Sequence, residues 1–122
     1  MGRKEIDELS KIAASAIALT FVPYFEGFGL PLVEAMKCGV PIISGDKTSL
    51  PEIAGDAAIY CNPFDIESIK NRMLKLVKDE GLYNSLSSNG LTRSKLFSWD
   101  NTAKSVWDEV VLCHKQQKNN TK

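Results

Sequence analysis

Histidine and cysteine are scarce in this chain, and their scarcity excludes several kinds of site. His114 is the single histidine, so a histidine-based metal cluster is impossible. The three cysteines, Cys38, Cys61 and Cys113, are odd in number and widely spaced, which argues against a disulfide framework and against a zinc site. We therefore expect reduced thiols, no metal site and a cytoplasmic protein. We interpret Cys38 and Cys61 as small buried apolar residues rather than nucleophiles.

Net charge and long apolar runs are missing as well. The 122 residues carry 15 basic and 15 acidic side chains, so the charge balance does not indicate a nucleic-acid partner or an acidic membrane surface. No apolar run approaches the roughly 20 residues that cross a bilayer, and the first residues lack the apolar core of a signal peptide. Hydrophobic content of 43% and charged content of 25% are typical of a soluble domain with one core.

Short apolar runs alternate with segments of helical period. The runs at 17–22, 40–44 and 58–61 predict three strands, and the first is apolar enough to be buried on both faces. Helices are predicted over 4–14, 31–38 and 50–54, after Asp65 and after Ser98. Strands that alternate with helices predict an α/β domain with a parallel sheet flanked by helices. Residues 1–122 contain no linker that would divide this single domain.

Local signals refine several of these elements. Ser49 and Glu52 have the spacing of a capping box, so we interpret them as caps of the helix at 50–54. Gly90 is expected to break or bend the polar segment at 81–96. Apolar stripes run along two helices, with Ile66, Ile69, Met73, Leu76 and Val77 on one, and Trp99, Ala103, Val106, Val110 and Cys113 on the last. Trp99 and Trp107 are interpreted as core or interface residues, and the polar segment 115–122 as a frayed or disordered tail.

The stretch from 23 to 41, PYFEGFGLPLVEAMKCGVP, is the most informative part of the chain. It places two carboxylates, those of Glu26 and Glu34, eight residues apart around a glycine-rich turn. Pro31 suits the first turn of a helix, where its missing N–H costs nothing. Gly39 suits the residue just past the end of that helix, where φ is often positive. The pattern predicts a strand, a turn, a helix and a second strand.

This turn is suited to a ligand that combines phosphates with hydroxyls. Gly27 and Gly29 allow a ligand to approach the backbone closely, because no Cβ stands in the way. The start of the following helix presents unpaired N–H groups and a partial positive charge, which favour a phosphate. Glu26 and Glu34 can line the same pocket, where carboxylates fit neutral hydroxyls of the ligand. A nucleotide sugar has such hydroxyls at both ends, on the sugar and on the ribose.

Four motifs occur in a characteristic order along the chain. The string EGFGLPLVEAMKCGVPIIS from Glu26 is followed by SLPEIAGDAA from Ser49, NPFD from Asn62 and FSW from Phe97. This set resembles the retaining glycosyltransferases with the E-x(7)-E signature, the glycosyl transferases group 1 of GT-B fold. That family includes sucrose synthases, sucrose-phosphate synthases and many bacterial capsule and lipopolysaccharide enzymes. The resemblance covers nearly the whole chain.

The resemblance implies a place within a longer enzyme. The donor-binding domain of this family has a Rossmann-like sheet in the strand order 3-2-1-4-5-6. This chain resembles strands 4, 5 and 6, the C-terminal part of that domain, so we expect the first half of the domain and the acceptor domain to be absent. The parent is then roughly three times longer, from usual domain sizes. The strand at 17–22 becomes an open edge, through which we expect homo-oligomers to form.

The resemblance also implies roles for the residues of the turn. Glu26 resembles the catalytic glutamate beside the donor sugar, and Glu34 resembles the glutamate that holds the ribose hydroxyls. The donor-binding residues implied in this way are Glu26, Gly27, Phe28, Gly29, Leu30 and Glu34. The backbone N–H groups of Phe28, Gly29 and Leu30 are expected to face the sugar and the diphosphate. Neither a metal nor a cofactor is implied, because the nucleotide-diphosphate sugar is the substrate.

Other interpretations stay open. Glu26 fits a solvent-facing turn residue, and Glu34 fits a residue that stabilises a helix dipole. The whole chain fits the donor half of a retaining hexosyltransferase of cell-surface polysaccharide or lipopolysaccharide synthesis, working in the cytoplasm or at the inner face of the membrane. It also fits a nucleotide-sugar binding module, or a subunit that completes a separately encoded glycosyltransferase. We expect the chain alone to be inactive, because the Arg and Lys that the family uses lie in the absent segment.

Overall fold

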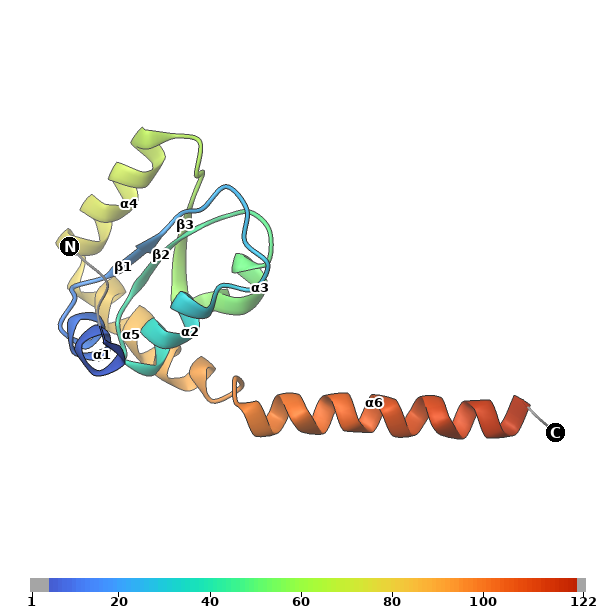
Figure 1. The fold of residues 1–122 in the computed structure, drawn as a ribbon. Coiled ribbons are helices and arrows are strands. Elements are labelled where there is room, and N and C mark those ends of the chain that lie inside the picture. Colours follow the sequence, from blue (N-terminus) through green and yellow to red (C-terminus); the bar gives the residue numbers. More distant parts are fainter. Residues whose placement is uncertain (1–4, 121–122) are drawn as a thin grey trace.

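A three-stranded parallel sheet lies at the centre of the fold, as the alternation of strands and helices predicts (Figure 1). The coordinates are a computed structural model, in which residues 5–120 are described. The strands β1 (Leu19–Phe21), β2 (Ile42–Gly45) and β3 (Ala58–Cys61) occur in the order β1-β2-β3. All four residues of the central strand β2 are buried. β1 is shorter than the run at 17–22 and only half-buried, because an edge strand has one neighbour. The expectation of burial on both faces was wrong for it.

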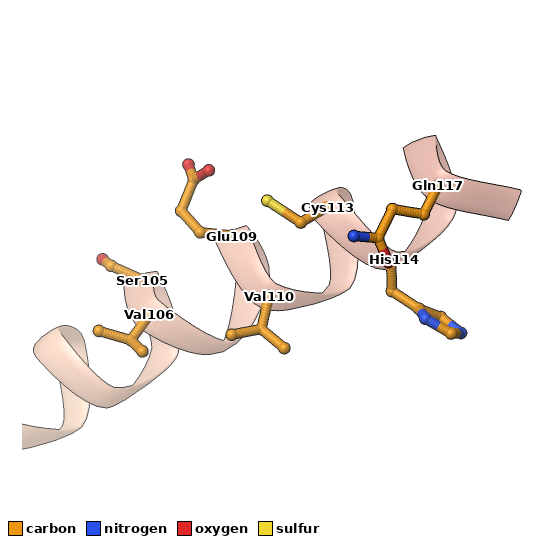
Figure 2. Close-up of a pocket in the computed structure, with 7 residues that line it drawn as sticks. All are labelled: Ser105, Val106, Glu109, Val110, Cys113, His114 and Gln117. Carbon is orange, nitrogen blue, oxygen red and sulfur yellow. The ribbon is translucent and has the colours of Figure 1, made fainter. Parts of the chain in front are cut away.

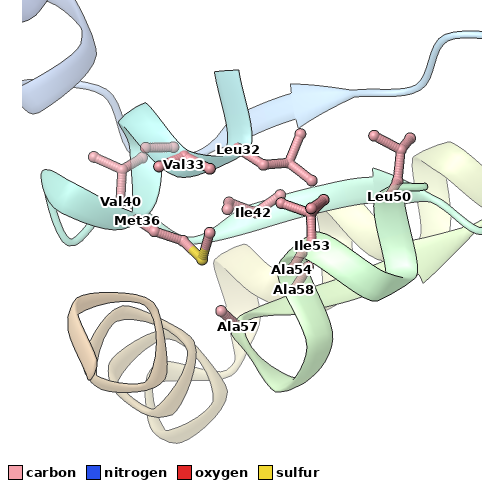
Figure 3. Close-up of a cluster of buried hydrophobic side chains, with 11 residues drawn as sticks. Leu32, Val33, Met36, Val40, Ile42, Leu50, Ile53, Ala54, Ala57 and Ala58 are labelled. Carbon is pink, nitrogen blue, oxygen red and sulfur yellow. The ribbon is translucent and has the colours of Figure 1, made fainter. Parts of the chain in front are cut away.

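Helices cover both faces of the sheet, and the alternation of side chains along β2 explains why. Ile42 packs with the helices α2 (Leu30–Lys37) and α3 (Leu50–Ala54), and Ile43 points to the opposite face, toward α4 (Ile66–Lys78) and α5 (Glu80–Ser94). Figure 3 shows the larger of the two clusters, in which side chains of α2 and α3 meet over β2. The fold is therefore the predicted α/β arrangement, a parallel sheet between two layers of helices.

Several predicted helix ends are confirmed in atomic detail. The Asp65 carboxylate accepts a hydrogen bond from the Glu67 amide at 2.9 Å, and the Ser98 hydroxyl accepts one from the Asn101 amide at 3.0 Å. Gly39 follows α2 with φ of 68°. These are the positions where the sequence predicted caps, since each residue type satisfies an otherwise unpaired helix end or adopts a positive φ.

Gly90 does not break its helix. α5 runs without interruption from Glu80 to Ser94, and Gly90 is buried within it. A Cβ added at Gly90 would lie 3.5 Å from the Cα of Met36, so the missing side chain lets α5 pass close to the backbone of α2. The glycine serves helix packing, which the local sequence did not reveal.

Two surface features differ from the sequence-based expectations, and an apolar residue of the first helix is exposed as well. Cys38 is exposed at the end of α2, whereas Cys61 is buried as expected. On α4 only Leu76 is buried, and Ile66 and Val77 are exposed. On α1 (Ile6–Ala14), predicted over 4–14, Leu9 is exposed and residue 4 lies outside the described part. α1 and α4 thus have outward apolar residues that none of residues 5–120 covers.

The last helix, α6 (Trp99–Asn120), leads away from the sheet toward the C-terminus (Figure 1). Residues 115–120 are helical where a frayed tail was expected, and 121–122 lie outside the described residues. The sequence contains no glycine or proline after Gly90, so nothing stops the helix once Ser98 has capped it. Among residues 5–120, no helix is long and apolar enough to cross a membrane.

Candidate functional site

The carboxyl ends of the three strands lead into three neighbouring loops. β1 continues into the glycine loop (residues 22–29), β2 into residues 46–49 and β3 into residues 62–65. The rings of Tyr24 and Phe64 stack with centroids 4.9 Å apart and an interplanar angle of 17°, so they join the first and third loops. Open α/β sheets bind their ligands at this edge. The glycine loop is therefore in the right place for a ligand site.

Gly29 sets the geometry of the glycine loop. It has φ of 98° and ψ of 48°, directly before the first residue of α2, and it is buried. A Cβ at this position would lie 3.0 Å from the Cδ2 atom of Leu50, which is itself fully buried. A side chain would therefore meet both a strained backbone and a filled core. Gly27 differs, because a Cβ there would have no atom within 4 Å.

The carboxylate of Glu26 folds back onto its own loop. Its Oε1 atom accepts hydrogen bonds from the amides of Gly27 at 3.1 Å and Phe28 at 3.3 Å. Within residues 5–120, the structure gives no hydrogen-bond acceptor for the amides of Gly29 and Leu30. Glu26 is thus held in one orientation by the loop, and two of the three amides expected to face a ligand are free to donate.

Glu34 lies on the exposed side of α2. It is the fifth residue of that helix and follows Leu30, also exposed, by one turn on the same face. No described side chain or amide pairs with its carboxylate. The helix dipole acts on charges within the first turn, and Glu34 lies beyond it. The dipole alternative therefore does not account for Glu34, and its contact with a ligand stays a prediction.

Ser49 is a loop-positioning residue that sequence reasoning missed. Its hydroxyl lies 3.1 Å from the carbonyl oxygen of Glu26 and 3.2 Å from that of Phe28, and donates toward both. The interpretation of Ser49 as a helix cap was wrong, since its side chain makes no cap hydrogen bond and its backbone is already helical, with φ of −76° and ψ of −12°. A capping residue has an extended backbone. Its partners lie 21 and 23 residues away in sequence, so no local pattern could indicate them.

Replacing Ser49 by alanine is expected to loosen the glycine loop. The substitution leaves two loop carbonyls without their donor, and a typical hydrogen bond contributes about 1 kcal/mol. We expect the free energy of unfolding to fall by about 1 kcal/mol, measured by urea denaturation. Ser88, exposed on α5, supplies the matched control, and Ser88→Ala should change stability by less than about 0.5 kcal/mol. Equal stability of the two variants would show that the Ser49 hydroxyl does not hold the loop.

An open groove borders the glycine loop on the side of α6. Its volume is about 210 Å³, and the rings of Phe28 and Phe97 meet edge to face beside it, with centroids 6.1 Å apart. Leu30 and Trp99 also line it, and Trp99 is 84% exposed. Trp99 and Trp107, both exposed, are therefore not core residues. The ring of Phe28 packs beside this groove, so any contact with a diphosphate falls to its backbone.

Two groups on β3, the buried Cys61 thiol and the half-buried Tyr60 hydroxyl, do not fit a nucleophile. Burial raises the pKa of the Cys61 thiol, the nearby Asp46 carboxylate raises it further, and Arg72 offsets part of the rise. Burial likewise raises the pKa of Tyr60, whose hydroxyl donates to the carbonyl of Gly55 at 2.6 Å. A thiol must ionise to attack. Cys61 packs in the buried cluster with Ile43 and Leu76, which confirms its interpretation as a packing residue. Among the described residues, no three His, Cys, Asp or Glu side chains are grouped to hold a metal ion.

The sequence that contains the glycine loop and α2 matches a known protein family. Residues 1–93 match the family described as Glycosyl transferases group 1. The chain belongs to this family. The O-antigen chain mannosyltransferase B of Escherichia coli is 38% identical to it over 95 residues, which are 78% of this chain and 25% of that protein. The sucrose-phosphate synthase of Spinacia oleracea is 32% identical over 120 residues, 96% of this chain and 11% of that protein.

A solved structure has the same fold as this group 1 glycosyltransferase chain. The sucrose-phosphate synthase of Thermosynechococcus elongatus superposes with a TM-score of 0.81 at 23% sequence identity, over 93% of this chain and 30% of the other. At that identity the likeness establishes the fold, a Rossmann-like α/β arrangement of the GT-B type. The chain spans about a quarter of the length of the E. coli mannosyltransferase and less of the plant enzyme.

Proposed function

We propose that this chain forms the donor-binding part of a retaining glycosyltransferase, corresponding to the C-terminal part of its donor domain. The parent enzyme transfers a hexosyl group from a nucleotide-diphosphate sugar to an acceptor hydroxyl, with retention of anomeric configuration. The proposal rests on one observation. A single loop-and-helix unit presents the Glu26 carboxylate, the free amides of Gly29 and Leu30, and Glu34 one turn further on.

The start of α2 suits the diphosphate. The amides of Gly29 and Leu30 and the positive end of the helix dipole can stabilise negative charge there. That charge grows as the diphosphate leaves, so donors fixed in advance lower the barrier to reaction. Gly29 contributes twice, since its positive φ directs the loop and its missing side chain lets the loop pack against Leu50. The contact is therefore made by backbone atoms whose positions the fold fixes.

Each of the two carboxylates binds one hydroxylated part of the donor, Glu26 the sugar and Glu34 the ribose. Glu26 lies in the loop before the helix and is held by two amides, which fits a group that must stay oriented beside the sugar and its reacting carbon. Glu34 is exposed on α2 with no partner among the described residues, which fits a carboxylate that accepts hydrogen bonds from both ribose hydroxyls. The diphosphate then lies between them, at the helix start.

The open edge of the sheet at β1 is where the rest of the donor-binding site would adjoin this chain. β1 is an edge strand of the described sheet, and in the order 3-2-1-4-5-6 the corresponding strand lies where the order reverses. Ligands of such sheets bind in the crevice at that point. The remaining donor contacts would then come from across β1, and self-association of the isolated chain through this edge stays a prediction.

The relatives suggest a setting for the parent enzyme. One is named as an O-antigen chain mannosyltransferase and another as a sucrose-phosphate synthase, so the family match leaves several acceptors possible. The higher identity to the mannosyltransferase favours synthesis of a cell-surface polysaccharide. The three free cysteines support a cytoplasmic location.

A hybrid enzyme tests the proposal. The 95 matched residues of the E. coli mannosyltransferase are replaced by their counterparts from this chain, and mannose transfer is measured. We expect transfer by the hybrid and none by the 122-residue chain alone. A hybrid that melts cooperatively but transfers no mannose would contradict the proposal. Transfer by the isolated chain would contradict the expectation that the other half of the site is needed.

A further inference from the structure

The hollow on α6 is formed by that helix alone. Val106, Val110 and Cys113 line it, and no residue of the sheet or of another helix does (Figure 2). The plant sucrose-phosphate synthase aligns across α6 and is much longer than this chain, so nothing about a partner follows from this exposed face. The contacts between α3 and α5 are different, because both sides of them lie within the described residues.

Arg93 on α5 binds the C-terminal end of α3. Its Nε atom donates to the carbonyl oxygen of Ile53 and its Nη2 atom to that of Glu52, both at 2.7 Å. The planar guanidinium offers paired donors in a fixed geometry, and the last carbonyls of a helix have no partner within it. Asn89, about one turn earlier on α5, donates to the carbonyl of Asp56 at 3.0 Å. Two side chains of α5 thus hold the end of α3 and the turn after it.

The turn after α3 leaves room for the guanidinium. Gly55 has φ of 52°, and a Cβ there would lie 2.6 Å from the Cζ atom and 2.7 Å from the Nη1 atom of Arg93. A side chain at this position could not share that space with the guanidinium. The carbonyl of Gly55 accepts from the Tyr60 hydroxyl, so β3 holds the turn as well. The glycine of the SLPEIAGDAA motif therefore serves the contact with Arg93.

The other end of α3 touches the glycine loop. The hydroxyl of Ser49, directly before α3, donates to the carbonyls of Glu26 and Phe28. Leu50, the first residue of α3, is fully buried next to Gly29. α3 has five residues, a length of about 7.5 Å, and so short a helix is not stable by itself. Its position is therefore set by the contacts at its two ends.

We propose that Arg93 is a positioning residue for the glycine loop and that it acts through α3. Arg93 fixes one end of α3, and thereby places Ser49 and Leu50 at the other end. These two residues in turn hold the loop that carries Glu26. α5 also packs closely on α2 at Gly90, so one helix places both elements that adjoin the loop. The effect on sugar transfer rests on the proposed function, whereas the effect on the loop does not.

Nuclear magnetic resonance of the 122-residue chain tests the effect on the loop. Arg93→Ala is expected to shift the amide proton and nitrogen resonances of residues 27–29. Arg72→Ala is the matched control, because Arg72 also donates through Nε to a backbone carbonyl, that of Tyr60 at 2.7 Å, but lies on α4 at the other face of the sheet. It should leave these resonances in place. A less stable Arg93→Ala chain with unchanged loop resonances would overturn the proposal.

A lysine at position 93 keeps the test valid if the alanine variant does not fold. Lysine retains the charge and a donor but loses the paired geometry of the guanidinium. Arg93→Lys should therefore shift the same loop resonances by a smaller amount than Arg93→Ala. If Arg93→Ala does not fold, shifted loop resonances in Arg93→Lys would support the proposal, and unchanged ones would overturn it.

Transfer kinetics supply a readout that a merely structural role would not move. The hybrid enzyme is built to include this chain through the end of α5, and rates are measured well below the melting temperature of each variant. Arg93→Ala is expected to lower kcat roughly 10–100-fold with a small change in KM, because a small misplacement of reacting groups has an effect of that size. Arg72→Ala should keep the parent kcat. An Arg93→Ala hybrid with the parent kcat would overturn the positioning role. A parent hybrid that transfers no mannose would contradict the proposed function instead, and the loop resonances would still test Arg93.

Discussion

Glu26→Gln is expected to lower the rate constant of mannose transfer by the hybrid enzyme roughly 10²–10³-fold, with a small change in KM. Glutamine keeps an oxygen that can accept from the amides of Gly27 and Phe28, so the loop should stay folded. What the substitution removes is the negative charge. In the proposed reaction, that charge stabilises the positive charge that develops at the sugar carbon as the diphosphate leaves. The loss should therefore appear in kcat.

The control for this experiment is a glutamate on the same domain but away from the glycine loop. Glu80 is exposed in the first turn of α5, and Glu80→Gln removes the same charge without touching the site. Its transfer rate should equal that of the parent hybrid. If Glu26→Gln and Glu80→Gln had the same rate, Glu26 would be the solvent-facing turn residue of the alternative interpretation.

Gly29→Ala is expected to lower the free energy of unfolding of the chain by about 2–3 kcal/mol. A non-glycine residue in the left-handed region costs roughly 1–2 kcal/mol. The new Cβ would also lie 3.0 Å from the Cδ2 atom of Leu50, a fully buried side chain, and such overpacking costs about 1 kcal/mol or more. Urea denaturation followed by circular dichroism measures the loss as a lower midpoint with an unchanged slope.

Gly27 provides a control two residues away in the same loop. A Cβ at Gly27 would have no atom within 4 Å, and its φ is not in the left-handed region. Gly27→Ala should therefore change the free energy of unfolding by less than about 0.5 kcal/mol. A similar loss for both alanine variants would mean that general loop flexibility, rather than the conformation of Gly29, explains the effect.

The parts of the fold that local rules determine could be predicted from the sequence. β3 and α3 begin and end where expected, because turn residues such as Gly55 bound these short apolar runs. Asp65 and Ser98 cap their helices for the same local reason. β1 is shorter than its apolar run, since the length of an edge strand depends on its neighbour. The packing role of Gly90 against Met36 also depends on a residue far away in sequence.

The candidate site likewise combines features that the local sequence predicts with features that depend on distant residues. Glycine at position 29 is required because only glycine combines a positive φ with so close an approach to Leu50. The sequence predicted a glycine there for a different reason, the approach of a ligand, and that part stays a prediction. The contact of Ser49 with the carbonyls of Glu26 and Phe28 joins two loops, and capping-box spacing suggested a different partner. The hydrogen bonds from the loop amides to Glu26 depend on side-chain torsions, which residue spacing does not determine.

Calorimetric titration of the hybrid with a nucleoside diphosphate tests the division of roles between the two carboxylates most directly. This ligand has the ribose and the diphosphate but no sugar. Glu34→Gln should weaken its binding roughly 10–100-fold, because hydrogen bonds to a charged group contribute about 1.5–3 kcal/mol. Glu26→Gln should leave the Kd within about threefold of the parent value. The opposite pattern, with the loss at Glu26 and none at Glu34, would contradict the account.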